Sequence, residues 1–426
     1  MSHPTQLSAL ATPLQWALGL AIGLSCMGTA FAQLQQDGSG STGGSGSGTA
    51  AEPKDPYYIG AGIGFTHDSN VLRQSNNDTS DYWTSLSLLG GLNKNLGRQR
   101  LYLDGTVSNN RYNEYKSLDN TSYGLNTGVD WETVNNLSGN VRYGVTQDLA
   151  NRALAGVPAT TSKNSQKTQL AGATARYGMT SRVALEGGLQ YRSVDYSLAQ
   201  YASLENTQKI ANAGVVYGLT GLLTLGVGVR GTKTDTPRYS PAGGDEADRR
   251  DVDFTVNWSP SGLSTISARL SLSDEDHTRA TALNFNGVTG QVGWDYRPTG
   301  RLRFNTLFSR DTGTEARFID FTGGDTTVGT ESYRLTTTLQ AGVTYALTGK
   351  IDTSLVASRA RGSLVSSNVS SGTDTLTTVG LGATYKATRS LLVSCKVGRE
   401  TRSTNSTFSS PYQSNTVGCL ANFTLR

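Results

Sequence analysis

The chain has 426 residues, of which only 16% are charged and 50 are glycine. Ordinary soluble domains have about 25% charged residues and about 7% glycine. No internal run of about 18 apolar residues exists, so a helical membrane protein is excluded. The net charge of +4 is too small and too evenly spread to indicate a nucleic-acid partner. A chain of low charge that is rich in Gly, Tyr and Thr is typical of a strand-rich protein.

Residues 1–32 have the pattern of a secretory signal. An apolar stretch over residues 13–28 precedes Ala30 and Ala32, which supply small residues at the −3 and −1 positions of a cleavage site. A lipoprotein signal ending at Cys26 is a less favoured interpretation, and the stretch is too short for a membrane-spanning helix. The mature chain is therefore expected outside the cytoplasm, where disulfides can form.

Residues 33–56 are dominated by Gly, Ser and Thr, and they predict a flexible linker. The remainder, 57–426, alternates between apolar residues and polar residues or Gly. The first such segment places Tyr57, Ile59 and Ile63 on one face and glycines on the other. Side chains on a strand alternate between faces, so each segment predicts a strand with one apolar face. Each run is about 10 residues long, the length of a tilted strand that crosses a bilayer.

An internal repeat of about 40 residues accompanies the alternation. An aromatic residue on the apolar face recurs just before a tight turn, at Trp131, Tyr177, Tyr217, Trp258, Tyr296, Tyr345 and Tyr385. Most of these aromatics are followed three positions later by Thr, as in Thr220-Gly221, and an apolar face resumes six positions after the aromatic. We expect the aromatics to form a girdle at one membrane interface.

Longer polar segments separate these turns. They cover residues 67–81, 113–121, 149–166, 195–207, 233–250, 274–284, 311–332, 361–375 and 402–412. Nine long loops on one side and eight short turns on the other predict an all-β, antiparallel, up-and-down transmembrane barrel of about 18 strands, with 16 as the other possibility. An outer-membrane barrel has short periplasmic turns and longer extracellular loops. A soluble β-helix or propeller is less compatible, because the repeat contains only two long strands.

The polar face of the predicted strands carries balanced charge. The lumen-facing candidates are Asp104, Asp130, Arg142, Glu186, Arg192, Arg230, Asp253, Arg269, Asp295, Arg303 and Arg334. These side chains could simply be a solvated wall whose charges pair across strands; Asp295 and Arg303, symmetric about Thr299, would be direct partners. They could also line a conduit for a hydrophilic solute without strong ion selectivity.

Cys395 and Cys419 fall on one face of the last two predicted strands, directly opposite each other if the hairpin turns about Thr407. They could form a cross-strand disulfide, or they could be two small apolar residues that face lipid. The pattern predicts no catalytic residues, no cofactor and no metal, since His67 and His277 lie in predicted loops and no ligand spacing appears. Asp68-Ser69-Asn70 could bind calcium, although turn formation is the more ordinary role.

The segment GAGIGFTHDSNVLR, Gly60 to Arg73, together with GRQRLYLD, Gly97 to Asp104, and Arg111-Tyr112-Asn113, resembles the type 2 β-barrel porin family. More narrowly, it resembles EpsL-like outer-membrane proteins of exopolysaccharide operons. This resemblance implies an outer-membrane component of exopolysaccharide biosynthesis or export. It supplies no catalytic residues.

Two classes of function follow. The first is transport, through a glycan-export conduit or a general porin. The second is a structural or binding barrel that anchors polysaccharide through loop aromatics, for which the candidates are Tyr201, Tyr239, Phe318, Phe321, Phe408 and Tyr412. An outer-membrane enzyme is the least expected class. The expected partners are outer-membrane lipid, the barrel-assembly machinery, polysaccharide and periplasmic export components, in the outer membrane of a Gram-negative bacterium.

Overall fold

The computed structural model describes most of the chain after the linker. Its described ranges are 56–75, 79–134, 136–151, 161–178, 182–312, 318–319, 325–326, 333–366, 369–406 and 409–425. The expected signal segment and nearly all of the expected linker lie outside these ranges. Within the ranges, no helix has the length and apolarity needed to cross a membrane.

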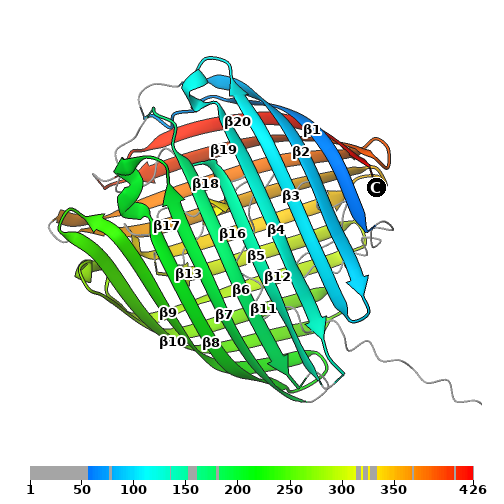
Figure 1. The fold of residues 1–426 in the computed structure, drawn as a ribbon, viewed down its shortest axis with the longest axis vertical. Coiled ribbons are helices and arrows are strands. Elements are labelled where there is room, and N and C mark those ends of the chain that lie inside the picture. Colours follow the sequence, from blue (N-terminus) through cyan, green and yellow to red (C-terminus); the bar gives the residue numbers. More distant parts are fainter. Residues whose placement is uncertain are drawn as a thin grey trace, which may run out of the picture.

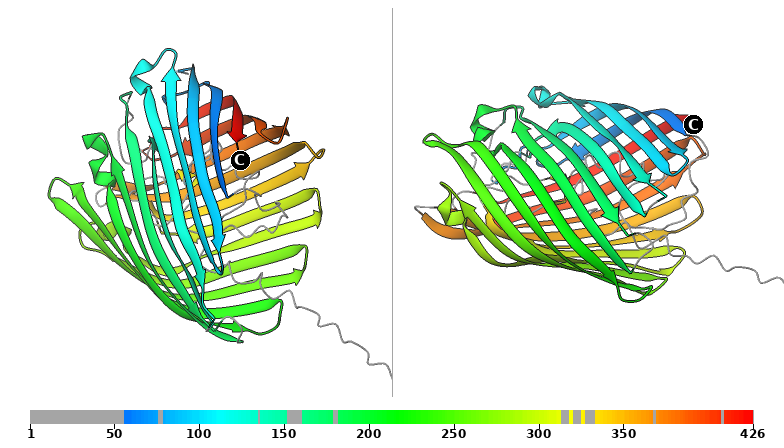
Figure 2. Two further views of the ribbon diagram at one scale, coloured as in Figure 1. Left: turned by 45° about the vertical axis from the view of Figure 1, so that its right-hand side comes forward. Right: turned by 60° about the horizontal axis from the view of Figure 1, so that its bottom comes forward.

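Eighteen antiparallel strands form one continuous sheet that closes on itself (Figures 1 and 2). They are β1 (Tyr57–Asp68), β2 (Asp81–Leu96), β3 (Gln99–Tyr112), β4 (Asn120–Glu132), β5 (Leu137–Leu149), β6 (Ser165–Tyr177), β7 (Val183–Tyr196), β8 (Asn206–Gly218), β9 (Leu223–Ser240), β10 (Gly243–Ser261), β11 (Ser264–His277), β12 (Phe285–Thr299), β13 (Leu302–Asp311), β16 (Tyr333–Ala346), β17 (Ile351–Ser366), β18 (Val369–Lys386), β19 (Leu391–Thr404) and β20 (Tyr412–Leu425). The last strand pairs with the first, from Ile59 with Leu425 to Asp68 with Thr416. The predicted fold class is therefore confirmed.

Alternation along each strand defines an outer and an inner face. In β1, Ile59, Ile63 and Phe65 are exposed, whereas Gly62 and Thr66 are buried. A band of exposed apolar side chains runs around the wall, so this part of the outer face suits lipid and the polar face lines the interior. Closure leaves no strand edge unpaired, as a strand protein in a bilayer requires.

The eight short turns all lie at one end of the barrel, as predicted, but their register differs from the predicted one. Each girdle aromatic pairs with the residue eight positions later, for example Tyr217 with Leu225 and Tyr345 with Thr353, and not with the residue six positions later. The turn is centred one residue after the repeated Thr. That Thr has a different role: the Thr220 side-chain oxygen accepts hydrogen bonds from the backbone N–H groups of Leu222 and Leu223, at 3.2 and 3.0 Å.

The same contacts occur at three further turns, where Thr299, Thr348 and Thr388 accept from the backbone two and three residues later. A Ser or Thr side chain that binds nearby backbone N–H groups stabilises a turn without needing an extra residue. The sequence repeat is therefore a turn-capping signal as well as an aromatic one.

The prediction of long loops at 233–250 and 361–375 is wrong. Most of each is strand: β9 continues to Ser240 and β10 begins at Gly243, and β17 and β18 continue to Ser366 and from Val369. These hairpins extend beyond the apolar band, where the outer face no longer meets lipid and is polar like the inner face. Hydrophobic alternation then disappears although the strand continues, so polarity alone looks like a loop.

In their described residues, the other connections at this end contain three short 3₁₀ helices and one pair of two-residue strands. These are η1 (Lys116–Leu118), η2 (Ala199–Leu204), η3 (Thr281–Leu283), β14 (Phe318–Ile319) and β15 (Asp325–Thr326). β14 and β15 pair with each other and not with the barrel wall.

The Asp68-Ser69-Asn70 segment clamps the seam where β1 meets β20. Asp68 accepts a hydrogen bond from the Ser414 hydroxyl, and the Ser69 hydroxyl accepts from the Asn415 backbone N–H at 2.9 Å. The Asn70 side-chain amide donates to the Gln413 carbonyl at 2.9 Å. This observation gives the Asp-Ser-Asn motif a structural role in closing the barrel.

Candidate functional site

The inner face of the barrel is the candidate site, and ten of the eleven lumen-facing candidates lie on it. They are Asp104, Asp130, Arg142, Glu186, Arg192, Arg230, Asp253, Arg269, Asp295 and Arg303, at positions that share a face with buried neighbours. Arg334 is different. It is exposed at a register shift near the start of β16, and its Nε donates to the Asn284 carbonyl at 3.1 Å, so it lies at the rim of the barrel.

Six charged side chains from β9, β10, β11 and β13 form an alternating chain along the inner wall, which we call the charge chain. Its members in order of contact are Asp253, Arg230, Asp251, Arg249, Asp311 and Arg269. Successive ion-pair distances are 3.1, 3.2, 2.9, 2.8 and 3.3 Å. The three arginines and three aspartates of these six balance one another; Glu275 lies further from Arg249, at 3.9 Å, and is also 3.3 Å from His277.

Arg249 is the most enclosed arginine of the charge chain, with a side chain only 2% exposed. Its guanidinium also donates to the hydroxyls of Ser273, Thr289 and Thr312 at 3.2, 3.1 and 2.8 Å. Buried charges need such partners, because an uncompensated charge away from water is strongly destabilising. Arg249 is thus held as a fixed part of the wall.

Other inner charges are also paired. Asp295 contacts Arg303 at 2.6 Å and Arg297 at 3.0 Å. Asp295 is in register with Asn305, so its ion pair with Arg303 is diagonal and the direct pairing about Thr299 is wrong. The wider turn explains this difference. Tyr58 donates its hydroxyl proton to Asp104 at 2.8 Å.

The predicted loop boundaries hid several inner charges, including Arg249, Glu275, Asp311, Asp374 and Arg402. All five are buried and point inward from strand ends that seemed to be loop. Their signal was present in the sequence, since Asp245, Arg249, Asp251 and Asp253 keep one parity along β10. The opposite face of this part of β10 is also polar, so the alternation that identifies a strand is missing there.

The interior is more tightly filled at the loop end than at the turn end. Inner residues on the loop half, such as Ser271, Thr289 and Thr336, are almost fully buried, whereas Arg303 near a short turn keeps 42% of its side chain exposed. Exposure at the short-turn end is uneven, because Ala184 and Val216 beside other short turns are buried.

A hydrophobic cluster crosses the loop end. Tyr201 and Leu204 of η2 pack in one buried cluster with Val194 and Tyr196 of β7 and with Ala360 of β17. Around the wall, β7 and β17 are separated by β8, β9, β10, β11, β12, β13 and β16. The connection between β7 and β8 therefore folds inward and reaches the opposite wall.

This packing affects the loop aromatics considered for glycan binding. Tyr201 is fully buried, and Tyr412 is buried with its hydroxyl donating to Glu400 at 2.7 Å, so neither is free to stack on a sugar. Tyr239 lies half-buried at the end of β9. Phe321 and Phe408, and the side chain of Phe318, lie outside what the structure describes.

His67 and His277 both lie on strands and not in loops. His67 faces outward on β1. His277 ends β11, where Nδ1 lies 2.7 Å from Asp245 and Nε2 lies 3.3 Å from Glu275. Across the described residues, no group of three or more His, Cys, Asp or Glu side chains is arranged to hold a metal ion.

The girdle aromatics lie at the short-turn end on outward positions. Tyr177, Tyr217, Trp258, Tyr345 and Tyr385 are exposed, and Trp131 and Tyr296 are half-buried. Tyr296 stacks on Trp294 with a ring separation of 5.5 Å. Amphipathic rings at this height suit a membrane–water interface.

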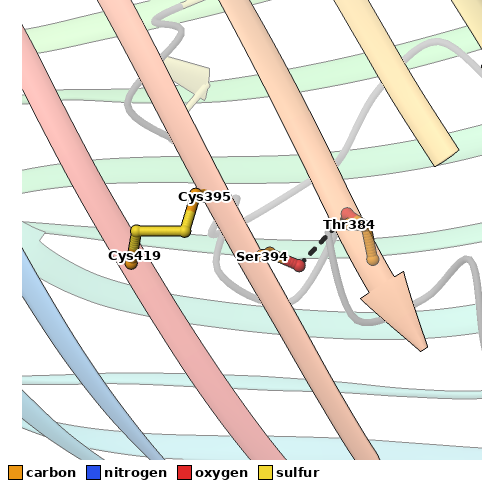
Figure 3. Close-up of a disulfide and its surroundings, with 4 residues drawn as sticks. All are labelled: Thr384, Ser394, Cys395 and Cys419. Atoms are coloured by element: carbon orange, nitrogen blue, oxygen red, sulfur yellow. Dashed lines mark hydrogen bonds between the residues drawn. A yellow bond between two sulfur atoms is a disulfide. The ribbon is translucent and has the colours of Figure 1, made fainter. Parts of the chain in front are cut away.

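Cys395 and Cys419 are directly in register on β19 and β20 and form a disulfide. Both are exposed on the outer face, while Ser394 points inward and hydrogen-bonds Thr384 at 3.1 Å (Figure 3). The disulfide is thus a cross-strand bond on the lipid-facing surface, so it occupies no part of the lumen.

A closed antiparallel barrel with an apolar outer face, a charge-compensated polar interior, short turns at one end and longer connections at the other is an outer-membrane β-barrel of the porin-like class. No protein-family model and no curated protein sequence matches this chain.

Among solved structures, the chain is similar to the outer membrane protein OpdK of Pseudomonas aeruginosa, at 12% identity over 87% of this chain and 99% of that chain, with a TM-score of 0.47. It is also similar to Pseudomonas aeruginosa OpdL, at 10% identity over 87% and 98% of the two chains, with a TM-score of 0.45. A third similar structure is the siderophore receptor PiuA of Acinetobacter baumannii, at 10% identity over 87% and 82%, with a TM-score of 0.43.

Proposed function

We propose that the protein is a conduit for hydrophilic, uncharged solutes across the outer membrane. The buried cluster that contains Tyr201 and Leu204 of η2 narrows this conduit at its loop end. The charge chain, whose members are all ion-paired, carries this proposal. A wall whose charges are already paired presents hydrogen-bonding groups without a net field, so it favours neither anions nor cations. The disaccharide and oligosaccharide class of solute fits such a wall, because hydroxyl groups can exchange hydrogen bonds with it.

The resemblance to EpsL-like proteins supports a finer proposal, in which the conduit serves exopolysaccharide biosynthesis or export. In this role polysaccharide and periplasmic export components would be its partners, after signal cleavage and insertion by the barrel-assembly machinery. Deleting the gene should lower secreted polysaccharide, and a normal polysaccharide yield would contradict the link to this pathway.

Planar-bilayer conductance tests the conduit. We expect the native protein to conduct weakly and a Tyr201→Ala/Leu204→Ala variant to conduct at least threefold more, because the cluster that spans the mouth is weakened. The reversal potential in a KCl gradient should stay near zero for both proteins, since the inner charges are paired.

Leu118→Ala is the matched control. Leu118 is equally buried, but its cluster with Val71 and Leu72 joins neighbouring loops at the barrel mouth and does not include Ala360. This variant should keep the native conductance. A Tyr201→Ala/Leu204→Ala protein that folds and conducts no more than the native protein would contradict the narrowing by this cluster, and no conductance in either protein would contradict a conduit.

A barrel that anchors polysaccharide or an assembly partner, without transport, is the second candidate. The tightly filled loop end favours it. Under this alternative, neither the Tyr201→Ala/Leu204→Ala variant nor the Leu118→Ala variant conducts. Replacement of the β7–β8 connection then lowers polysaccharide retention at the cell surface without changing the conductance.

A further inference from the structure

The outer face of β13, β17 and β19 carries four exposed arginines, which we call the arginine patch. Its members are Arg310, Arg359, Arg361 and Arg399. They point outward, because the adjacent residues Asp311, Ala360 and Glu400 are buried on the inner face. Arg310 and Arg361 flank Thr337 in one register row across three neighbouring strands.

The height of the arginine patch follows from the residues beside it. The outward residue before Arg310 on β13 is Phe308, and the outward residue before Arg399 on β19 is Val397; both are exposed and apolar. The arginines are thus the first charges beyond the apolar band, at the loop end of the barrel. In an outer-membrane barrel the loop end faces the outside, so this is the headgroup level of the outer leaflet.

Among the described residues, no acidic side chain forms an ion pair with the arginine patch. On the described outward positions of β13, β16, β17, β18, β19 and β20 there is neither Asp nor Glu, and the polar neighbours are residues such as Thr337, Thr377 and Asn415. Elsewhere at this height the outward basic residues have acidic neighbours. Lys233 forms an ion pair with Glu246 at 2.7 Å, and Arg250 is in register with Asp274.

We propose that the arginine patch binds the phosphate groups of anionic lipids in the outer leaflet. Guanidinium groups form bidentate hydrogen bonds with phosphate, and four of them with no acidic partner among the described residues attract an anion strongly. The patch faces the bilayer, with an apolar surface directly below it for acyl chains. A phospholipid can place its phosphate against the arginines and its acyl chains against the apolar surface, whereas a free anion can contact only the arginines.

Native mass spectrometry of the purified full chain tests this proposal. The protein is mixed with phosphatidylglycerol and phosphatidylethanolamine of identical acyl chains, and the retained molecules of each lipid are counted. We expect the native protein to retain phosphatidylglycerol at least fivefold over phosphatidylethanolamine. Replacing all four arginines, Arg310→Gln, Arg359→Gln, Arg361→Gln and Arg399→Gln, should bring this ratio close to one.

A Lys209→Gln/Lys233→Gln/Arg250→Gln variant is the control, because it removes outward positive charges at a similar height on β8, β9 and β10. It should keep the native ratio. A native ratio near one would overturn the proposal without any variant, as would an unchanged ratio in the arginine variant. Displacement of phosphatidylglycerol by millimolar inorganic phosphate would also overturn it, because the site would then recognise a soluble anion. Neither measurement depends on whether the barrel conducts.

Discussion

Single threonines at the short turns combine two tasks that the barrel needs at its periplasmic end. Thr220, Thr299, Thr348 and Thr388 each accept two backbone hydrogen bonds within the turn, so the turn is rigid although it contains few residues. The aromatic three positions earlier lies on the outward face. A residue that orders the turn thereby fixes the height at which the aromatic meets the interface.

Thr348→Ala should lower the free energy of unfolding by about 1 kcal/mol, because the Lys350 and Ile351 backbone N–H groups lose their acceptor at 3.2 and 3.0 Å. Thr348→Ser keeps the hydroxyl and should remain close to the native value. Urea unfolding in lipid vesicles, followed by tryptophan fluorescence, measures both variants. Equal stability of the Ala and native proteins would contradict a capping role.

His277 should make the stability of the loop end depend on pH. Burial lowers its pKa, but hydrogen bonds to Glu275 and Asp245 outweigh burial and raise the pKa above the ordinary 6.5. A raised folded-state pKa means that the protonated ring is stabilised by folding. Its contribution is therefore complete below about pH 6.5 and is lost as the pH rises through the folded-state pKa.

As the pH is raised from 6 to 9, we expect the urea midpoint of the native protein to decrease. The midpoint of the His277→Gln variant should change less over this range. Asp245 adds a second dependence of stability on pH, in the acidic range. Burial raises its pKa, but hydrogen bonds from His277 and from the backbone of Ala280 and Arg279 lower it overall. Its contribution is present above about pH 3.8 and is lost as the pH falls through its folded-state pKa. A flat native midpoint from pH 6 to pH 9 would contradict the His277 prediction.

At the level of strands and hairpins, β19 and β20 form a covalently closed unit. The Cys395–Cys419 disulfide joins residues separated by 24 positions, and its place on the outer face leaves the inner Ser394–Thr384 contact undisturbed (Figure 3). Because β20 also pairs with β1, fixing this hairpin fixes one side of the seam that closes the barrel.

Reduction of the disulfide should lower the free energy of unfolding by about 3 kcal/mol, since the unfolded chain gains the freedom of an open loop of this length. The Cys395→Ala/Cys419→Ala variant should have this lower stability with or without dithiothreitol. Urea unfolding with and without reductant measures the difference. A reductant effect of similar size in the double variant would show that the disulfide is not its source.

For the whole molecule, closure depends on close backbone approach at the seam. A β-carbon added at Gly60 would lie 2.5 Å from the Phe423 carbonyl oxygen and 2.8 Å from a Leu89 methyl group. Real β-carbons do not approach a backbone atom this closely, so β1 and β20 would have to separate. At Gly231, in contrast, nothing lies within 4 Å of the added atom.

Gly60→Ala should therefore reduce the fraction of protein that reaches the closed barrel, and Gly231→Ala should not. Heat-modifiable mobility on cold gels separates closed from unfolded barrels in membrane extracts. We expect at least a twofold loss of the closed form for Gly60→Ala. Equal folded fractions in the two alanine variants would contradict a tight seam.

The sequence by itself determined the barrel, a strand number of about 18 with 16 as the other possibility, the end at which the short turns lie, and the shared face of the two cysteines. All of these features can be read from the alternation of apolar and polar residues and from residues that lie close together in the chain. Lipid imposes this alternation wherever it contacts one face of a strand. Strand ends above the bilayer lack that contrast, which is why Arg249 and Asp311 were assigned to loops.

Only the tertiary structure decided which inner charges meet and what fills the lumen. Arg249 reaches Asp311 from another strand, and Tyr201 belongs to the same buried cluster as Ala360 of the opposite wall. These contacts depend on the curvature of the closed sheet and on the inward path of one loop. Distances across the lumen have no periodic signature along the chain, so no local pattern could have predicted them.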